Sequence, residues 1–283
     1  MDIVNKPIKN EEIKEIELNG LCTFRNKCNE LGVKYYLAFG TLLGAARHQG
    51  FIPWDDDIDV LVPRCDYDYM LKNFKAFETD DWEIVSNEIN HDYCLLWSKY
   101  SNKRTTLLPT RFNTGYTYGL SIDLFPLDYL EATTIDDASL FIEQTREYYN
   151  SRMRKIQARA VTKRGLSNDV RRLARKTYFK TIGRIFGNAT EIIEDTNLYI
   201  HNRCQGGPYA IYAYDKYCRA WGKKDFENDK FVEKQLIFEK ELFRVPINYD
   251  NVLMRSYGDY MKLPPKEKQI SLHNFDAFYK TVM

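Results

Sequence analysis

The spacing of apolar and polar residues changes twice within the first fifty positions. Residues 10–31 carry apolar residues at near-helical spacing, and Gly32 is suited to end that helix. Residues 33–39 are β-branched and aromatic, which predicts a strand. Gly40-Thr41 then predicts a turn, and the residues after it predict a short helix. We therefore expect a helix, a strand, a glycine turn and a second helix.

Apolar residues and carboxylates alternate just after this unit. Asp57 and Asp59 are interleaved with Ile58 and Val60 in a stretch that Pro63 ends. Successive side chains of an extended strand point to opposite faces, so both carboxylates share one face while the apolar residues enter a core. Two adjacent anions beside a core repel each other unless a cation joins them. A magnesium ion takes oxygen ligands and keeps coordination sites for phosphate, so we expect one here.

A second strand repeats this pattern with one carboxylate. Residues 120–127 are apolar apart from Ser121 and Asp123. A buried aspartate is normally paired or bound to a metal. Asp123 is therefore the expected third ligand, across the sheet from Asp57 and Asp59. Further strands are expected at residues 82–86, 93–100 and 105–108.

Several residues around these carboxylates are candidates for contacts with phosphate. A strand, the Gly40-Thr41 turn and a helix N-terminus together form a phosphate cradle, although such turns are common. Arg47 adds a fixed cation, and Trp54 belongs to the same expected binding set. Lys99 is a further candidate, as is Arg104. A solvated charge at a strand edge is the more common interpretation of both.

Composition is typical of a globular chain, and we expect no targeting segment. Of its 283 residues, 44% are apolar and 29% charged, which fits one large domain or two small ones. The N-terminus is charged where a signal peptide needs an apolar core. An uncharged run of 12 residues, 35–46, is shorter than the ~20 that span a bilayer. Six cysteines without a CxxC pair suggest reduced thiols, with a disulfide pair as the alternative. We therefore expect a cytoplasmic protein, either free or peripheral at the inner face of the cytoplasmic membrane.

The charge distribution is uneven although the net charge is only +1. Residues 152–184 hold twelve Lys and Arg against one acidic residue, Asp169, and are compatible with helices. A basic amphipathic helix can lie on an anionic membrane or hold an acidic polymer, and a merely solvated insertion is an equally open interpretation. No nucleic-acid-binding motif accompanies the charge, so we expect no nucleic acid partner.

The chain beyond residue 206 is rich in tyrosine. Aromatic rings can bind a quaternary ammonium group by cation–π attraction, although most such residues are ordinary core or surface aromatics. The pattern at residues 249–273 predicts a capped helix and a tail that prolines stop.

Three motifs in this order resemble the LicD family of phosphotransferases, which is related to fukutin and the fukutin-related protein. They are AFGTLLGAARHQGFIPWDDDIDVLVPRCDY, SIDLFPLD and NYDNVLMRSYGDYMKLPPKEK. The resemblance implies an α+β, nucleotidyltransferase-like fold: a small mixed sheet flanked by helices, with a mainly helical basic insertion and C-terminal part. We expect a nucleotidyltransferase-like catalytic core at 1–130, the basic helical insertion at 131–200 and a helical part at 201–283 that packs on the core, together one integrated domain.

The resemblance also implies an activity. Similar family members transfer phosphocholine from CDP-choline to a sugar of a cell-surface glycan such as teichoic acid or lipopolysaccharide, and fukutin relatives transfer ribitol phosphate. Carried over to this chain, Asp57, Asp59 and Asp123 are catalytic residues and ligands of Mg²⁺ or Mn²⁺, and Gly40-Thr41 is the phosphate turn. The chain departs from the family at residues 271–274, which replace an expected histidine pair.

The leading hypothesis is transfer from a CDP-alcohol, with CDP-choline favoured, to a glycan that can be lipid-linked. Asp123 would also accept the proton of the acceptor hydroxyl. One alternative keeps the fold but moves a nucleoside monophosphate from an NTP and releases pyrophosphate. Another is a non-catalytic protein that binds an anionic glycan or a membrane through residues 152–184. The nucleotide product, CMP or pyrophosphate, separates the first two.

Overall fold

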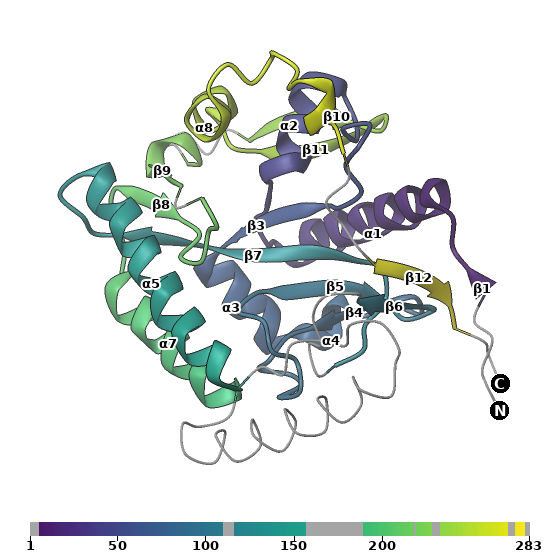
Figure 1. The fold of residues 1–283 in the computed structure, drawn as a ribbon, viewed down its shortest axis with the longest axis horizontal. Coiled ribbons are helices and arrows are strands. Elements are labelled where there is room, and N and C mark those ends of the chain that lie inside the picture. The colour runs from purple at the N-terminus through teal and green to yellow at the C-terminus, as the bar shows by residue number, and fades with distance from the viewer. Residues whose placement is uncertain are drawn as a thin grey trace.

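A mixed seven-stranded sheet forms the centre of the described structure (Figure 1). The computed structural model describes residues 6–109, 116–156, 189–217, 219–227, 233–270 and 275–280. Five strands follow the order β2 (Tyr36–Leu37), β3 (Asp59–Pro63), β7 (Ser121–Leu130), β5 (Ser98–Asn102) and β4 (Trp82–Val85). β8 (Tyr209–Ile211) also pairs with β7, and β9 (Ala220–Gly222) pairs with β8.

The sheet is mixed because β3 and β7 run parallel while its other strand pairs are antiparallel. Ile58, Val60 and Val62 are each 0% exposed, as their alternation with the carboxylates predicts. The expected α+β fold class, a mixed sheet with helices around it, is thus confirmed.

Helices flank the sheet, and the first lies where the sequence predicts it. They are α1 (Asn10–Leu31), α2 (Phe39–His48), α3 (Arg64–Lys72), α4 (Phe74–Phe77), α5 (Ile135–Ile156), α7 (Ala189–Arg203) and α8 (Tyr249–Tyr257), with the 3₁₀ turns η1 (Lys223–Asp225) and η2 (Lys266–Lys268). α1 ends at Gly32, whose φ of 70° is the left-handed conformation that glycine adopts readily. Its stripe of Leu21, Phe24 and Cys28 is fully buried in the core.

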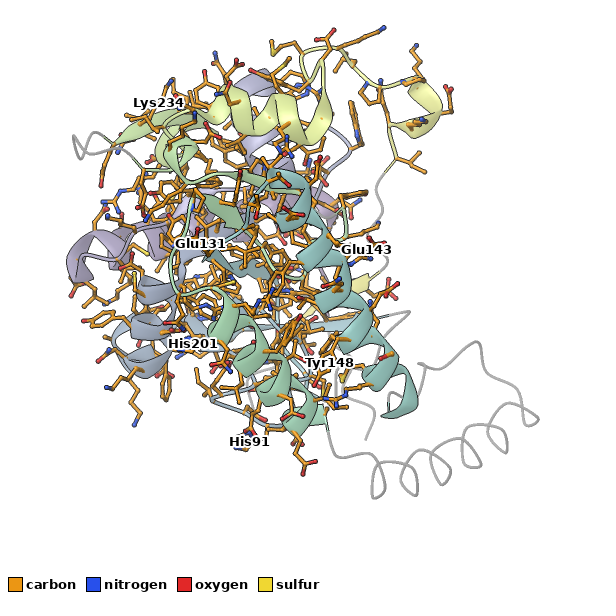
Figure 2. The ribbon with its side chains drawn as sticks, turned by 90° about the vertical axis from the view of Figure 1, so that its left-hand side faces the viewer. His91, Glu131, Glu143, Tyr148, His201 and Lys234 are labelled. Atoms are coloured by element: carbon orange, nitrogen blue, oxygen red, sulfur yellow. The ribbon has the colours of Figure 1, made fainter. Side chains whose placement is uncertain are left out.

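The long helices α5 and α7 lie side by side and cover the β8–β9 end of the sheet (Figures 1 and 2). The Tyr199 ring of α7 stacks on Phe141 and Tyr148 of α5, with centroid separations of 5.6 and 5.7 Å. Residues 157–188, which hold most of the predicted basic segment, lie outside the described residues.

The structure differs from the sequence-based expectation in two places. The strand predicted at 33–39 is reduced to β2, because α2 already begins at Phe39. The part at 201–283 was expected to be helical, and helix α8 is present there, but five strands, β8–β12, also lie in this part of the described chain. β10 (Lys234–Phe238) and β11 (Glu241–Val245) make a hairpin, and β12 (Phe275–Tyr279) pairs with β6 (Thr105–Pro109) and β1 (Lys6–Pro7).

None of the described helices combines the length and the apolar composition needed to cross a membrane. Cys22, Cys28, Cys65, Cys94 and Cys204 are free thiols.

Candidate active site

Asp59 and Asp123 lie side by side on neighbouring strands. The parallel register of β3 and β7 pairs these two residues, and the Asp123 N–H donates to the Ile58 carbonyl at 2.9 Å. Paired residues of adjacent strands project from the same face of a sheet, and the strands are ~4.8 Å apart. Both aspartates are half-buried, while the apolar residues around them are fully buried. The expectation that Asp123 lies across the sheet from Asp59 is therefore confirmed.

Lys99 and Trp97 hold the Asp123 carboxylate from the other side. The ammonium of Lys99 forms an ion pair with Oδ1, and Trp97 Nε1 donates to Oδ2 at 3.2 Å. Burial lowers the pKa of Lys99, but the Asp123 charge and, more weakly, Asp59 leave that pKa above its ordinary value. Lys99 is only 8% exposed, on a strand between β7 and β4. Its interpretation as a solvated strand-edge charge was therefore wrong.

The strand register pairs two of the three expected carboxylates, Asp59 and Asp123. Asp57 lies two residues before β3. Within the described part of the chain, no three histidine, cysteine, aspartate or glutamate side chains are close enough to hold a metal ion. The Asp59–Asp123 pair nevertheless offers carboxylate oxygens from adjacent strands, the donors that hard divalent ions prefer. This donor set fits Mg²⁺ or Mn²⁺, with Lys99 as a resident positive charge on one carboxylate.

Thr41 ties α2 to the start of β3. Its hydroxyl accepts the Asp59 backbone N–H at 2.8 Å, and the side chain is 3% exposed. The hydroxyl keeps its own proton to donate. The Ala38 N–H also donates to the Asp59 carbonyl at 3.0 Å. The Asp59 backbone is thus fixed through both its N–H and its carbonyl.

The expected glycine turn is the first turn of α2, and its unusual backbone lies at Phe39. This residue has a φ of 44°, in the left-handed region that a bulky side chain adopts at a cost of about 1–3 kcal/mol. At Gly40 the missing side chain matters instead, because an added Cβ would lie 2.5 Å from Oδ2 of Asp55. Asp55 therefore packs against the N-terminus of α2. Strain of this kind is typical of functional sites.

Arg47 and Trp54, which we expected to contact phosphate, lie near the C-terminal end of α2. Arg47 Nη1 donates to the Tyr260 carbonyl at 2.7 Å, and its Nε donates to His48 Nε2 at 3.0 Å. Burial lowers the pKa of His48, and the Arg47 charge lowers it further. Trp54 meets the His48 ring edge-on, with centroids 6.3 Å apart. Arg47 thus contacts the C-terminal segment, and its phosphate role stays a prediction.

Arg219, which was not predicted from the sequence, packs against the strained Phe39. Its guanidinium makes a bidentate ion pair with Asp215, at 2.6 and 2.8 Å, and lies 4.5 Å from the Phe39 ring centroid. It also donates to the Tyr257 hydroxyl at 3.4 Å. Burial raises the pKa of Tyr257 to about 12; Arg219 acts against this shift and Asp59 adds to it.

Two buried phenols, Tyr93 and Tyr212, complete the surroundings of Asp123. Among the described residues neither hydroxyl has a hydrogen-bond partner. Burial raises the pKa of both phenols, and the Asp123 charge raises both further. Both therefore remain neutral hydroxyls at physiological pH.

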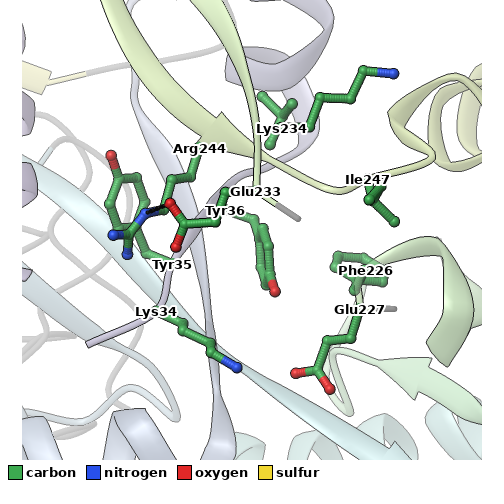
Figure 3. Close-up of a pocket in the computed structure, with 10 residues that line it drawn as sticks. Lys34, Tyr35, Tyr36, Phe226, Glu227, Glu233, Lys234, Arg244 and Ile247 are labelled. Atoms are coloured by element: carbon green, nitrogen blue, oxygen red, sulfur yellow. Dashed lines mark hydrogen bonds and ion pairs between the residues drawn. The ribbon is translucent and has the colours of Figure 1, made fainter. Parts of the chain in front are cut away.

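A separate cavity of about 180 Å³ lies where the chain enters β2 (Figure 3). Lys34, Tyr36 and Glu227 line it together with the Arg244–Glu233 ion pair, whose atoms are 3.0 Å apart. No residue predicted for the site lines this cavity. This cavity is thus distinct from the Asp59–Asp123 site.

The mixed sheet, the paired aspartates on parallel strands and the helix fixed to the first aspartate define a nucleotidyltransferase-like domain. Residues 32–166 match the family model described as "LicD/FKTN/FKRP, nucleotidyltransferase domain". All predicted site residues fall within this range. Residues 32–166 therefore form a domain of the LicD/FKTN/FKRP type, and the resemblance drawn from the motifs is confirmed for this domain.

Individual relatives extend the comparison. The chain is 25% identical over 265 residues to lipopolysaccharide cholinephosphotransferase LicD of Haemophilus influenzae. This alignment covers 92% of this chain and 94% of that protein. It is 35% identical over 88 residues to ribitol 5-phosphate transferase FKRP of Homo sapiens, covering 24% of this chain and 17% of that protein. An uncharacterized protein of Rickettsia typhi, RT0683, is 29% identical over 130 residues, 41% of its length. The two relatives named for an activity are both transferases of phospho-alcohol groups.

Proposed function

We propose that this chain transfers a phospho-alcohol, with phosphocholine favoured, from a CDP-activated donor to a sugar hydroxyl of a cell-surface glycan such as lipopolysaccharide or teichoic acid. The relative aligned over nearly the whole chain is named for phosphocholine and lipopolysaccharide. The relative matched over a shorter segment is named for ribitol 5-phosphate. The transferred group common to both names is a phosphorylated alcohol.

The observation that carries the proposal is the register pair of Asp59 and Asp123 with Lys99 beside it. Phosphoryl transfer is catalysed mainly by positioning the reactants and by neutralising charge. Two carboxylates on inner strands of one sheet hold their separation rigidly, since main-chain hydrogen bonds fix both. A protein that only binds an anionic glycan gains nothing from carboxylates placed in this way.

In the proposed reaction, some residues hold the donor and the metal ion, and another residue accepts the proton of the acceptor hydroxyl. The acceptor hydroxyl oxygen attacks the phosphorus that bears the alcohol, the bond from that phosphorus to the CMP oxygen breaks, and CMP leaves. We expected Asp123 to take the hydroxyl proton, but Lys99 and Trp97 already occupy both of its oxygens. We therefore assign proton acceptance to Asp57, at the mouth of β3.

The remaining groups hold the donor. Asp59 and Asp123 would hold the magnesium or manganese ion, which when bound supplies positive charge beside the diphosphate. The first turn of α2 has backbone N–H groups without acceptors inside the helix and the positive end of the helix dipole, which favour an anion. Thr41 and Lys99 add a hydroxyl proton and an ammonium charge next to the aspartates.

The test measures which nucleotide is released. The protein is incubated with magnesium, a glycan extract and, in turn, CDP-choline, CDP-ribitol or CTP. We expect CMP from CDP-choline, and we expect its release to require both the metal and the glycan. Pyrophosphate from CTP would favour nucleotidyl transfer instead, and no release from any donor would refute the donor assignment.

A further inference from the structure

Exposed apolar side chains gather in residues 254–270, at the end of α8 and in the loop after it. Eleven large apolar side chains are more than a third exposed among the described residues, and five lie in this segment. They are Met254 at 51%, Tyr257 at 39%, Met261 at 58%, Leu263 at 52% and Ile270 at 58%. We call this segment the apolar–basic loop. Single exposed apolar residues are ordinary, but a cluster of this kind marks an interaction site.

Basic residues are interleaved with these apolar ones. The apolar–basic loop carries Arg255, Lys262, Lys266 and Lys268 against two acidic residues, Asp259 and Glu267. All four basic side chains are exposed. The segment therefore presents apolar and cationic groups together.

This combination favours an anionic membrane over a protein partner. Protein interfaces are depleted of lysine, and their apolar centre is contiguous with a polar rim around it. A second copy of this chain in a two-fold dimer would bring the same lysines against each other. Segments that lie in a membrane interface, in contrast, combine inserted apolar side chains with lysine and arginine, which anionic headgroups attract.

The apolar–basic loop is also attached to the candidate site. Arg47, at the end of α2, donates to the Tyr260 carbonyl at 2.7 Å and to the Lys262 carbonyl at 3.5 Å. The first turn of the same helix holds Asp59 through Thr41. Figure 1 shows α8 close to α2, above the central sheet. One rigid element thus connects the loop with the aspartates.

We propose that residues 254–270 are a docking surface for anionic lipid bilayers and hold the Asp59–Asp123 site at the membrane surface. The apolar side chains enter the interface while the lysines meet the headgroups. The proposal concerns lipid binding without any donor or acceptor, so it stands or falls separately from the proposed reaction.

The test is co-sedimentation of the full chain with phosphatidylglycerol–phosphatidylcholine vesicles, compared with pure phosphatidylcholine vesicles. We expect binding to the anionic vesicles that weakens as salt is raised. Each lysine removed is expected to lower the binding constant about fivefold, so Lys266→Gln with Lys268→Gln should lower it about 25-fold. Leu263→Ser should lower it as well, because less apolar surface enters the interface.

Matched variants elsewhere on the surface serve as controls. Lys72 and Lys75 are exposed lysines outside the loop, and Leu140 on α5 is 50% exposed. Lys72→Gln with Lys75→Gln, and separately Leu140→Ser, should leave binding unchanged. Equal loss in control and loop variants would overturn the proposal, as would the absence of vesicle binding by the unaltered chain. A concentration-dependent dimer that Leu263→Ser disrupts, without vesicle binding, would show that a second copy occupies the surface instead.

Discussion

Two aspartates on β7 form ion pairs of different character. Asp128 is bound by Arg64 through two hydrogen bonds, at 2.7 and 2.9 Å, and its side chain is 1% exposed. Asp123 lies five residues earlier, is bound by Lys99 and Trp97, and has a side chain 21% exposed. An odd spacing along a strand places the two carboxylates on opposite faces of the sheet.

We infer from this difference that the Arg64–Asp128 pair is structural and that the Lys99–Asp123 pair belongs to the proposed site. The Arg64–Asp128 pair is closed, because a planar guanidinium covers both carboxylate oxygens of a buried partner. The Asp123 carboxylate stays partly accessible and faces a second carboxylate, Asp59, across the parallel register. Two adjacent, partly accessible carboxylates repel each other and lower the stability of the fold, and such an arrangement is typical of a site that receives a ligand.

The largest expected effect is on catalysis and lies at the open pair. Asp123→Asn removes the charge that pairs with Lys99 and that, in the proposed reaction, would also hold the divalent ion, so we expect CMP release to fall about 10³-fold or more. Asp128→Asn should leave the rate per folded molecule nearly unchanged. Steady-state CMP release, normalised to folded protein by circular dichroism, measures both. Similar rates for the two variants would contradict the distinction between the Lys99–Asp123 and Arg64–Asp128 pairs.

The next effect is on stability and lies at the closed pair. Arg64→Met leaves the buried Asp128 carboxylate without its partner, so we expect the free energy of unfolding to fall by about 3–5 kcal/mol. Arg104 pairs with Asp81 on the surface, and its side chain is 68% exposed. Arg104→Met should therefore cost less than about 1 kcal/mol. Urea unfolding measures both, and equal losses would contradict this ranking.

A smaller loss of activity is expected from Lys99→Met. The substitution keeps the Trp97 hydrogen bond but removes the ammonium that orients Asp123, and changes to such supporting groups typically cost about 10–100-fold. The dependence of the rate on magnesium concentration should change with it. A variant with unaltered rate and metal dependence would show that Lys99 only neutralises a buried charge.

The smallest loss is expected from Arg219→Lys. Lysine cannot form the bidentate pair with Asp215 and also stack on Phe39. We expect about a tenfold fall in kcat, because the first turn of α2 loses its support. Arg25→Lys is the matched control: Arg25 pairs with Glu241 and lies 5.0 Å from the centroid of a phenylalanine ring, away from the site. An equal fall in both variants would mean that the loss is only one of stability.

Local alternation was enough to predict the aspartates, because a carboxylate between buried apolar residues is visible in the sequence. It was not enough for Lys99, whose burial depends on β5 being an inner strand, and strand order is a long-range property. One signal was present: Trp97 and Lys99 are two residues apart, a spacing that places both on one face of a strand.

The β10–β11 hairpin was missed for a different physical reason. Its turn residues, Glu239 and Lys240, have φ of 49° and 70°. Two-residue hairpin turns need such positive values and usually recruit Asn-Gly or Asp-Gly, so the expected turn signal is absent here. Arg219 was missed because its role depends on Asp215, Phe39 and Tyr257, which only the folded chain brings together.

The most direct test of the central claim is CMP release by Asp59→Asn. Asp59 contributes its backbone to Thr41 and its strand to the sheet, and an asparagine preserves both. We predict that CMP release from CDP-choline with magnesium and glycan falls about 10³-fold or more while the urea midpoint stays unchanged. A folded Asp59→Asn variant that releases CMP at the rate of the unaltered chain would contradict the assignment of the Asp59–Asp123 pair as the catalytic centre.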